Sequence, residues 1–144
     1  MKNSENFKLN EKKNIYNTIY GRLDSVSLFK ITKIIFINMV ITQQLIEAVW
    51  NKALSVPGYN PEVWRQDFAK AWINKNAYGT TGPYGWEIDH RIPLSKKGSD
   101  DLSNWFPCQW ENNRSKGDDY PKFKTKITNE GNRNVQKEQL WVVK

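Results

Sequence analysis

The 144-residue sequence has very little cysteine. Cys108 is its single cysteine, which excludes an internal disulfide and a zinc site built from several cysteines. A small domain without a disulfide or a structural zinc site must be stabilised by the packing of apolar side chains. Such side chains are plentiful, because hydrophobic residues make up 38% of the chain and include 7 Trp, 6 Tyr and 6 Phe. The composition therefore excludes wholesale disorder, and the length predicts one domain with one core.

Long hydrophobic runs are also scarce. The most apolar stretch, residues 27–41, is interrupted by Lys30, Lys33 and Asn38. It falls short of the roughly 20 apolar residues that a membrane-spanning helix needs. It also lacks the small-residue cleavage site that follows the apolar run of a secretory signal. We therefore expect no membrane span and a cytoplasmic location, with secretion as an effector left open.

Acidic residues are outnumbered, 15 against 22 Lys and Arg, which gives a net charge of +7. Residues 1–38 carry 7 basic and 3 acidic side chains, residues 39–112 carry 7 and 8, and residues 113–144 carry 8 and 4. A nearly neutral middle is thus flanked by two basic segments of +4 each. A basic balance attracts polyanions, of which nucleic acid is the commonest. Charge excess also serves solubility alone, so this feature leaves both interpretations open.

Residues 1–38 differ in composition from the rest of the chain. They contain no Trp and no Pro, and Lys, Asn, Ile, Phe and Tyr account for 23 of them. Apart from a weak helical pattern at residues 12–23, they show no sustained period. We interpret them as a peripheral basic segment outside a domain of residues 39–144. The segment is either an arm that holds nucleic acid or translated upstream sequence, with Met39 as the true start.

The first part of the 39–144 region predicts helical structure followed by turns. Thr42 can cap a helix over residues 43–54, whose apolar side chains recur at intervals of three and four. Asn60 and Pro61 predict a short helix that ends at about residue 67. The pattern of residues 68–76 fits a helix or a strand equally well. Residues 78–84 predict a loop.

The remainder of the chain favours strands. Residues 86–92 and 105–109 predict two short strands, with a polar connection at 93–103 between them and the start of a helix at 111–116. Apolar residues and Thr125 alternate with lysines after Pro121, up to a turn at residues 129–132, and residues 139–143 are apolar again. This pattern predicts a C-terminal β-hairpin. The predicted fold class is α+β, with flanking helices around the two strands.

The chain's only histidine, His90, follows Asp89 at the end of the first predicted strand. A carboxylate is a hard ligand for Mg²⁺ or Mn²⁺, and an imidazole can take a proton near neutral pH. The pair alone is weak evidence for catalysis, because it is more typical of a hydrogen-bonded histidine at a strand end. The residues that follow favour a catalytic role for the pair. Asn104 lies 14 residues after His90, and Asn113 lies 23 residues after it, within the sequence ENNRSKGD.

This pattern resembles the HNH endonuclease family, and the matching stretch is residues 86–118. The resemblance implies a ββα-metal site, in which two antiparallel strands, their loop and a helix surround one divalent cation. It also implies that His90 is the general base that activates water, and that Asp89 and Asn113 are the metal ligands. Asn104 is expected to bond the backbone across the loop and so to fix the turn that aims His90.

The resemblance also indicates which ion and which substrate contacts to expect. One carboxylate and one amide oxygen favour Mg²⁺ or Mn²⁺ over Zn²⁺. Glu87, two residues before Asp89, is either an outer-shell acid or a solvated strand residue. Five basic residues are candidates for binding nucleic acid, although the loop lysines are equally typical of solvated charge: Arg91, Lys96, Lys97, Arg114 and Lys116.

The sequence departs from the family at a second metal site. Many members carry two Cys-x-x-Cys pairs that hold a structural zinc. Here the second pair falls on Gln109 and Asn112, and there is no upstream pair. We therefore expect no structural zinc, so the Trp-rich core, the helix at 43–54 and the hairpin must supply the stability.

The resulting hypothesis is a divalent-metal-dependent HNH endonuclease that hydrolyses phosphodiester bonds in nucleic acid, with double-stranded DNA as the expected substrate. One alternative is a catalytically silent nucleic-acid-binding module of the same fold. The presence together of Asp89, His90, Asn104 and Asn113 argues against that alternative. A toxin or effector nuclease would use the same chemistry, and the sequence does not separate it from a housekeeping or defence enzyme. Sequence specificity and oligomeric state are not predicted.

Overall fold

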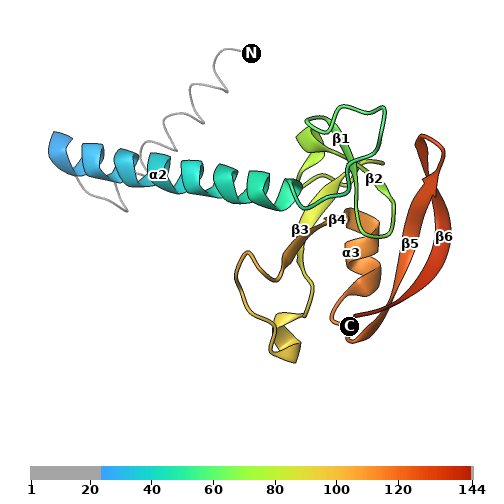
Figure 1. Ribbon diagram of the computed structural model, residues 1–144. Coiled ribbons are helices and arrows are strands. Elements are labelled where there is room, and N and C mark those ends of the chain that lie inside the picture. Colours follow the sequence, from blue (N-terminus) through green and yellow to red (C-terminus); the bar gives the residue numbers. More distant parts are fainter. Residues whose placement is uncertain (1–23, 144) are drawn as a thin grey trace, which may run out of the picture. The chain divides into compact units, whose positions relative to one another are not determined.

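The computed structural model describes residues 24–143 (Figure 1). The weak helical pattern at residues 12–23 lies outside the described residues. The chain divides into two compact units with the boundary between Thr42 and Gln43, and each is described by itself. The helices and strands confirm the α+β class. In order the α-helices and strands are α2 (Ser25–Trp50), β1 (Trp64–Gln66), β2 (Trp72–Asn74), β3 (Trp86–His90), β4 (Trp105–Gln109), α3 (Trp110–Lys116), β5 (Lys122–Glu130) and β6 (Arg133–Val142). Two 3-10 helices, Lys75–Ala77 and Leu94–Lys96, follow β2 and β3.

Helix α2 is longer than predicted, since it spans residues 25–50 rather than 43–54. Asp24 precedes it, and its carboxylate accepts a hydrogen bond from the backbone N–H of Ser27 at 2.7 Å. Asp24 is therefore the N-terminal cap, whereas Thr42 lies inside the helix. The sequence interpretation found no sustained period in residues 1–38 and therefore missed the part of α2 at residues 25–38, whose apolar residues are not confined to one helix face.

Among the described residues, α2 is long and apolar enough to cross a membrane, by length and composition only. Its most apolar 18-residue window has a mean hydropathy of 1.5, and none of that window is buried. This differs from the expectation drawn from residues 27–41 alone, because the helix continues to Trp50. Core helices and leader sequences share this length and composition, so the cytoplasmic location stays a prediction.

The core of the second unit is built on tryptophan, in line with the composition. Trp50 and Trp86 are fully buried, and their ring centroids are 5.4 Å apart. Val49, Ala53 and Ile73 complete the buried cluster. A fully buried aromatic side chain stabilises a fold by about 2–3 kcal/mol. This cluster fixes the start of β3, because Trp86 is its first residue.

Strands β1 and β2 replace the short helix predicted from Asn60. The Asn60 side chain does accept a hydrogen bond from the N–H of Glu62, but only one turn follows. The chain then extends into β1, which pairs antiparallel with β2 from Trp64 opposite Asn74 to Gln66 opposite Trp72. The short-helix prediction is therefore wrong. For residues 68–76, the strand alternative is correct at β2.

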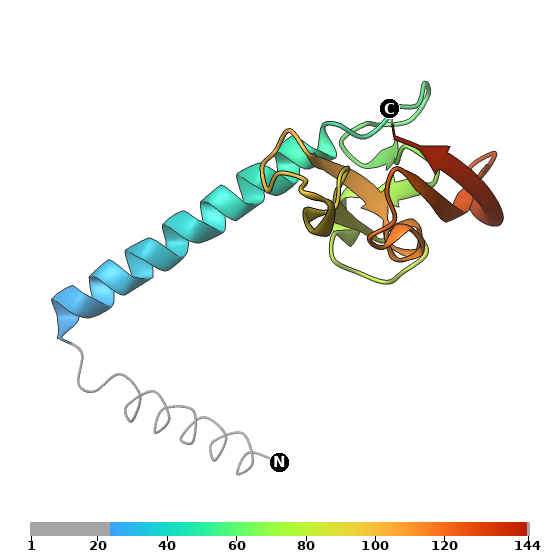
Figure 2. The ribbon, with the colours of Figure 1, turned by 90° about the horizontal axis from the view of Figure 1, so that it is seen from below.

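Strands β3 and β4 are antiparallel, with Trp86 opposite Gln109 and His90 opposite Trp105. Helix α3 follows β4 directly, and the Gln109 side chain caps it by accepting from two backbone N–H groups of its first turn. Strands β5 and β6 form an antiparallel hairpin at the C-terminus. Figures 1 and 2 show α3 between the β3–β4 pair and this hairpin, so one face of α3 is directed toward β3.

Candidate active site

Asp89 and Lys116 form a buried ion pair where α3 meets β3. Lys116 Nζ lies 2.9 Å from Asp89 Oδ2, and the two side chains are 1% and 11% exposed. The ammonium also donates to the backbone oxygen of His90 at 2.8 Å. Asp89 Oδ1 accepts from the N–H of His90, whereas the buried Oδ2 receives no hydrogen bond of good geometry from the described residues. Burial raises the pKa of Asp89, and the charge of Lys116 opposes that shift.

Asn113 of α3 is oriented by Glu87 of β3. The amide nitrogen of Asn113 donates to Glu87 Oε2 at 2.7 Å. Glu87 and Asp89 are two residues apart on one strand, so their side chains share the face that α3 covers. Within the described part of the chain, no donor contacts the amide oxygen of Asn113. That oxygen is therefore available as a ligand on the same face as Asp89.

His90 is held by a residue that the sequence reasoning missed. Its Nε2 lies 2.9 Å from a carboxylate oxygen of Asp100, in the loop between β3 and β4. Trp105 Nε1 lies 3.1 Å from the same nitrogen and 3.2 Å from Asp100 Oδ1. The carboxylate favours a proton on Nε2; the indole N–H of Trp105 then donates to Asp100 Oδ1 rather than to the imidazole, and the imidazole lone pair is on Nδ1. No spacing rule distinguished Asp100 from its neighbour Asp101.

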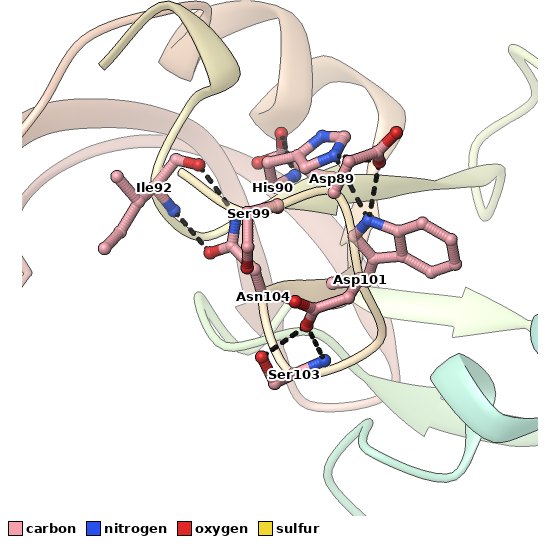
Figure 3. Close-up of polar contacts among 9 residues, drawn as sticks. Asp89, His90, Ile92, Ser99, Asp101, Ser103 and Asn104 are labelled. Atoms are coloured by element: carbon pink, nitrogen blue, oxygen red, sulfur yellow. Dashed lines mark hydrogen bonds and ion pairs between the residues drawn. The ribbon is translucent and has the colours of Figure 1, made fainter. Parts of the chain in front are cut away.

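Asn104 closes the base of the loop that carries Asp100. Its Oδ1 accepts from the N–H of Ile92, and its Nδ2 donates to the backbone oxygens of Ile92 and Ser99, all at 2.8–2.9 Å (Figure 3). A Cβ at Gly98 would lie 1.8 Å from the Ile92 oxygen, so only glycine fits beside this closure. Asn104 therefore bonds across the loop, and its backbone oxygen also accepts from the N–H of Arg91, next to His90.

The five basic candidates do not share one environment. Lys116 is buried against Asp89, and its ammonium lies 5.9 Å and 5.8 Å from the centroids of the Phe106 and Phe123 rings. Arg114 is exposed, with its guanidinium 4.9 Å from the centroid of the Trp110 ring. The other three are also exposed, in or next to the loop after β3: Arg91, Lys96 and Lys97. These four cations are exposed, and one of them, Arg114, also lies 4.0 Å from a carboxylate oxygen of Glu87.

A second buried carboxylate, Asp67, lies on the other side of the β4–α3 junction and was also missed. It accepts hydrogen bonds from the N–H groups of Ala69, Ala71 and Gln109 and from the amide of Asn112, at 2.9–3.1 Å. Burial raises the pKa of Asp67 to about 6, against the lowering effect of these bonds. Gln109 and Asn112 are the two positions at which the resemblance implied zinc-binding cysteines. A hydrogen-bonded network occupies them instead.

The donors at the Asp89 site suit a hard cation. Strand β3 contributes the carboxylate of Asp89, and α3 contributes the amide oxygen of Asn113, whose amide nitrogen is bonded to Glu87. No cluster of three or more His, Cys, Asp or Glu side chains able to hold a metal occurs in the described range. The only cysteine does not contribute, because burial raises the pKa of the Cys108 thiol well above its usual range.

Residues 84–122 match the family model described as HNH endonuclease. This segment belongs to the HNH endonuclease family. The HNH segment runs from the loop before β3 to the first residue of β5, so it includes every site residue above except Asp67. The search of curated proteins and the search of solved structures gave no significant match. The resemblance drawn from the residues is confirmed, and the family assignment indicates nuclease activity on nucleic acid.

Proposed function

We propose that the HNH segment is the catalytic centre of an endonuclease that hydrolyses phosphodiester bonds in double-stranded DNA with one Mg²⁺ or Mn²⁺ ion. The observation that carries this proposal is the hydrogen bond from Asn113 to Glu87 beside the buried Asp89. This bond uses the amide nitrogen of Asn113 and leaves its amide oxygen free of donors from the described residues, and that oxygen and the carboxylate of Asp89 would hold the cation. A bound divalent cation supplies charge neutralisation at the scissile phosphate and at the leaving 3′-oxygen.

His90 is the proposed general base. Water attacks the phosphorus, its proton passes to Nδ1 of His90, and the bond from phosphorus to the 3′-oxygen breaks. The leaving oxygen takes a proton from solvent, so the products are a 5′-phosphate and a 3′-hydroxyl. Asp100 stabilises the Nε2–H tautomer that this step requires and the imidazolium that it produces.

Lys116 has a different proposed role from the exposed cations. Because its ammonium is buried beside Asp89, it favours the ionised carboxylate that a metal ligand must be. Its second bond, to the backbone oxygen of His90, ties α3 to the end of β3. The exposed Arg91, Lys96, Lys97 and Arg114 are the proposed phosphate contacts.

Cleavage of a supercoiled plasmid tests the proposal. Nicking or linearisation with Mg²⁺ or Mn²⁺, and its loss on adding EDTA, would support a metal-dependent DNA endonuclease. A silent binding module would shift the plasmid on a gel without cutting it. A labelled RNA of matched sequence shows whether the reaction is confined to DNA. Elemental analysis of the same protein tests the prediction that it holds no structural zinc.

We further propose that residues 39–144 suffice for folding and cleavage. The core residues Val49 and Trp50 and the whole HNH segment follow Met39. A chain that starts at Met39 should therefore unfold cooperatively and cut the plasmid. If residues 1–38 are a nucleic-acid arm, their loss should weaken DNA binding and flatten its salt dependence; if they are translated upstream sequence, both should hardly change. Loss of folded protein would contradict this domain boundary.

A further inference from the structure

A cavity of about 500 Å³ lies directly beside the HNH site, and the mechanism above does not use it. Five aromatic side chains line it: Phe68, Trp105, Phe106, Phe123 and Trp141. We call it the aromatic pocket. Its volume is within the range of roughly 300–1,000 Å³ that is usual for small-molecule sites. The pocket joins β4 to the C-terminal hairpin, because Phe106 belongs to β4 and Phe123 to β5.

The rings of the aromatic pocket are prearranged. Phe68 makes edge-to-face contacts with Phe106, Phe123 and Trp141, at centroid distances of 5.2–5.7 Å. Trp141 Nε1 donates to the hydroxyl of Thr125 at 2.9 Å, so its polar atom is already satisfied. Phe123 is buried, and the other four rings of the lining are only partly buried. A flat apolar ligand would therefore meet ordered ring surfaces at a small cost in side-chain entropy.

The position and charge of the aromatic pocket indicate the kind of ligand. Its wall reaches the site, since Trp105 Nε1 lies 3.1 Å from Nε2 of His90. Arg91, the residue after His90, lines the same pocket, and its exposed side chain makes no hydrogen bond or ion pair within the described residues. Lys52 is the second cation of the lining, and its ammonium is fixed by the backbone oxygen of Trp105 at 2.8 Å. Aromatic faces beside cations are the combination that binds bases together with their phosphates.

We propose that the aromatic pocket binds one unpaired nucleobase of the strand that is cut, with Arg91 on a phosphate next to it. This inference rests on the proposed function, because it assumes that a phosphodiester lies at His90. A base inside a duplex is stacked on both sides and cannot enter such a pocket. The substrate is therefore DNA with a single-stranded or extruded nucleotide beside the scissile bond.

Binding to single-stranded oligonucleotides with one missing base tests the proposal. The probes are fluorescein-labelled 12-mers in which a tetrahydrofuran abasic residue replaces each nucleotide in turn, and Kd is measured by anisotropy in EDTA. Stacking of a base on aromatic side chains contributes about 1–3 kcal/mol, so its loss at the pocket register should raise Kd by about 5- to 100-fold. Equal affinity for all probes would overturn the proposal.

Variants assign the effect to the pocket. Trp141→Leu and Phe68→Leu remove rings from two different chain segments, and both should abolish the penalty for the missing base while circular dichroism stays unchanged. Trp64→Leu is the matched control, because Trp64 packs against Tyr84 and does not line the pocket, and it should keep the full penalty. A penalty that survives in both folded pocket variants would overturn the proposal.

The binding experiment is independent of catalysis. A base-dependent Kd without cleavage of either the plasmid or the single-stranded 12-mers in Mg²⁺ would support the pocket and contradict the proposed nuclease function. Cleavage without any base-dependent Kd would contradict the pocket and leave the nuclease function standing.

Discussion

Two buried carboxylates, Asp67 and Asp89, lie close together in the sequence and have opposite environments. Asp67 accepts four hydrogen bonds, all from neutral backbone or amide donors. Asp89 accepts one from a backbone N–H, and its second oxygen meets only the ammonium of Lys116. A saturated carboxylate has no capacity left for a ligand, whereas an unsaturated one beside a cation retains it. The difference is the one expected between a structural carboxylate, Asp67, and the proposed metal ligand, Asp89.

The largest expected difference between the Asp89 region and the Asp67 region is in the effect of substitutions on the cleavage rate. His90→Ala removes the proposed proton acceptor next to Asp89 and should lower the cleavage rate by about 10²- to 10⁴-fold, because general base catalysis contributes that much. The thermal unfolding midpoint and Mg²⁺ binding should stay near those of the wild type, since the imidazole is not a proposed ligand. Plasmid cleavage and calorimetry measure both. Wild-type turnover in this variant would contradict the mechanism.

The converse effect is expected in stability. Asp67→Ala leaves four buried donors without an acceptor, so it should lower the free energy of unfolding by about 3–5 kcal/mol in urea titrations. The rate of cleavage per folded molecule should hardly change. Asp118→Ala, at an exposed carboxylate, is the control and should cost little. An equally small loss in Asp67→Ala would show that the network does not hold the β4–α3 junction.

The pH dependence of stability gives a second measure of Asp67. Its pKa is about 6 in the folded protein and close to 3.8 when unfolded, so the folded state binds the proton more tightly. The contribution of this residue to stability is therefore present below pH 4 and is lost as the pH rises to about 6. Relative to Asp67→Asn, which does not titrate, the wild type should lose up to about 3 kcal/mol over this range. A relative gain with rising pH would show that the hydrogen bonds outweigh desolvation.

The Mg²⁺ dependence of cleavage should change in variants of the residues around Asp89 and not in variants of Asp67. Asp89→Asn and Asn113→Ala should raise the Mg²⁺ concentration for half-maximal cleavage by at least about 10-fold, with partial recovery at saturating Mg²⁺. Glu87→Gln should raise it by about 10-fold, because residues that orient ligands have effects of this size. Titrations of the cleavage rate with Mg²⁺ measure the change. Unchanged midpoints in Asp89→Asn and Asn113→Ala would exclude both residues as ligands.

The smallest effect is expected at Asp100. Its side chain is 66% exposed, so its pairing with His90 is screened by solvent. Asp100→Asn should lower the cleavage rate by about 2- to 5-fold, without changing the Mg²⁺ midpoint. The adjacent Asp101, which accepts from the N–H of Ser103, serves a turn instead. A loss as large as that of His90→Ala would mean that Asp100 takes part in proton transfer directly.

Sequence patterns over short stretches predicted those elements that depend mainly on contacts between neighbouring residues. The strands predicted at residues 86–92 and 105–109 and the helix predicted at 111–116 are present, although the first strand ends at His90 and the helix begins at Trp110. The motif selected Asp89, His90, Asn104 and Asn113. Asp67 was not predicted, because its partners Gln109 and Asn112 lie 42 and 45 residues away. Strands β1 and β2 have three residues each and depend on burial against the rest of the domain. For such segments tertiary contacts override local propensity.

The closure made by Asn104 has a consequence for how this hairpin can change during evolution. The Asn104 side chain is hydrogen-bonded to both the N–H and the backbone oxygen of Ile92. These bonds hold the two ends of the loop together, so the ends stay in place when the residues between them change. Lengthening a loop whose ends are fixed costs little, about 0.6 kcal/mol for each doubling. The exposed turn at Lys96 and Lys97 is thus a point where additional segments can be inserted without disturbing the strands. A new recognition element could enter the chain there and lie close to His90 from the start.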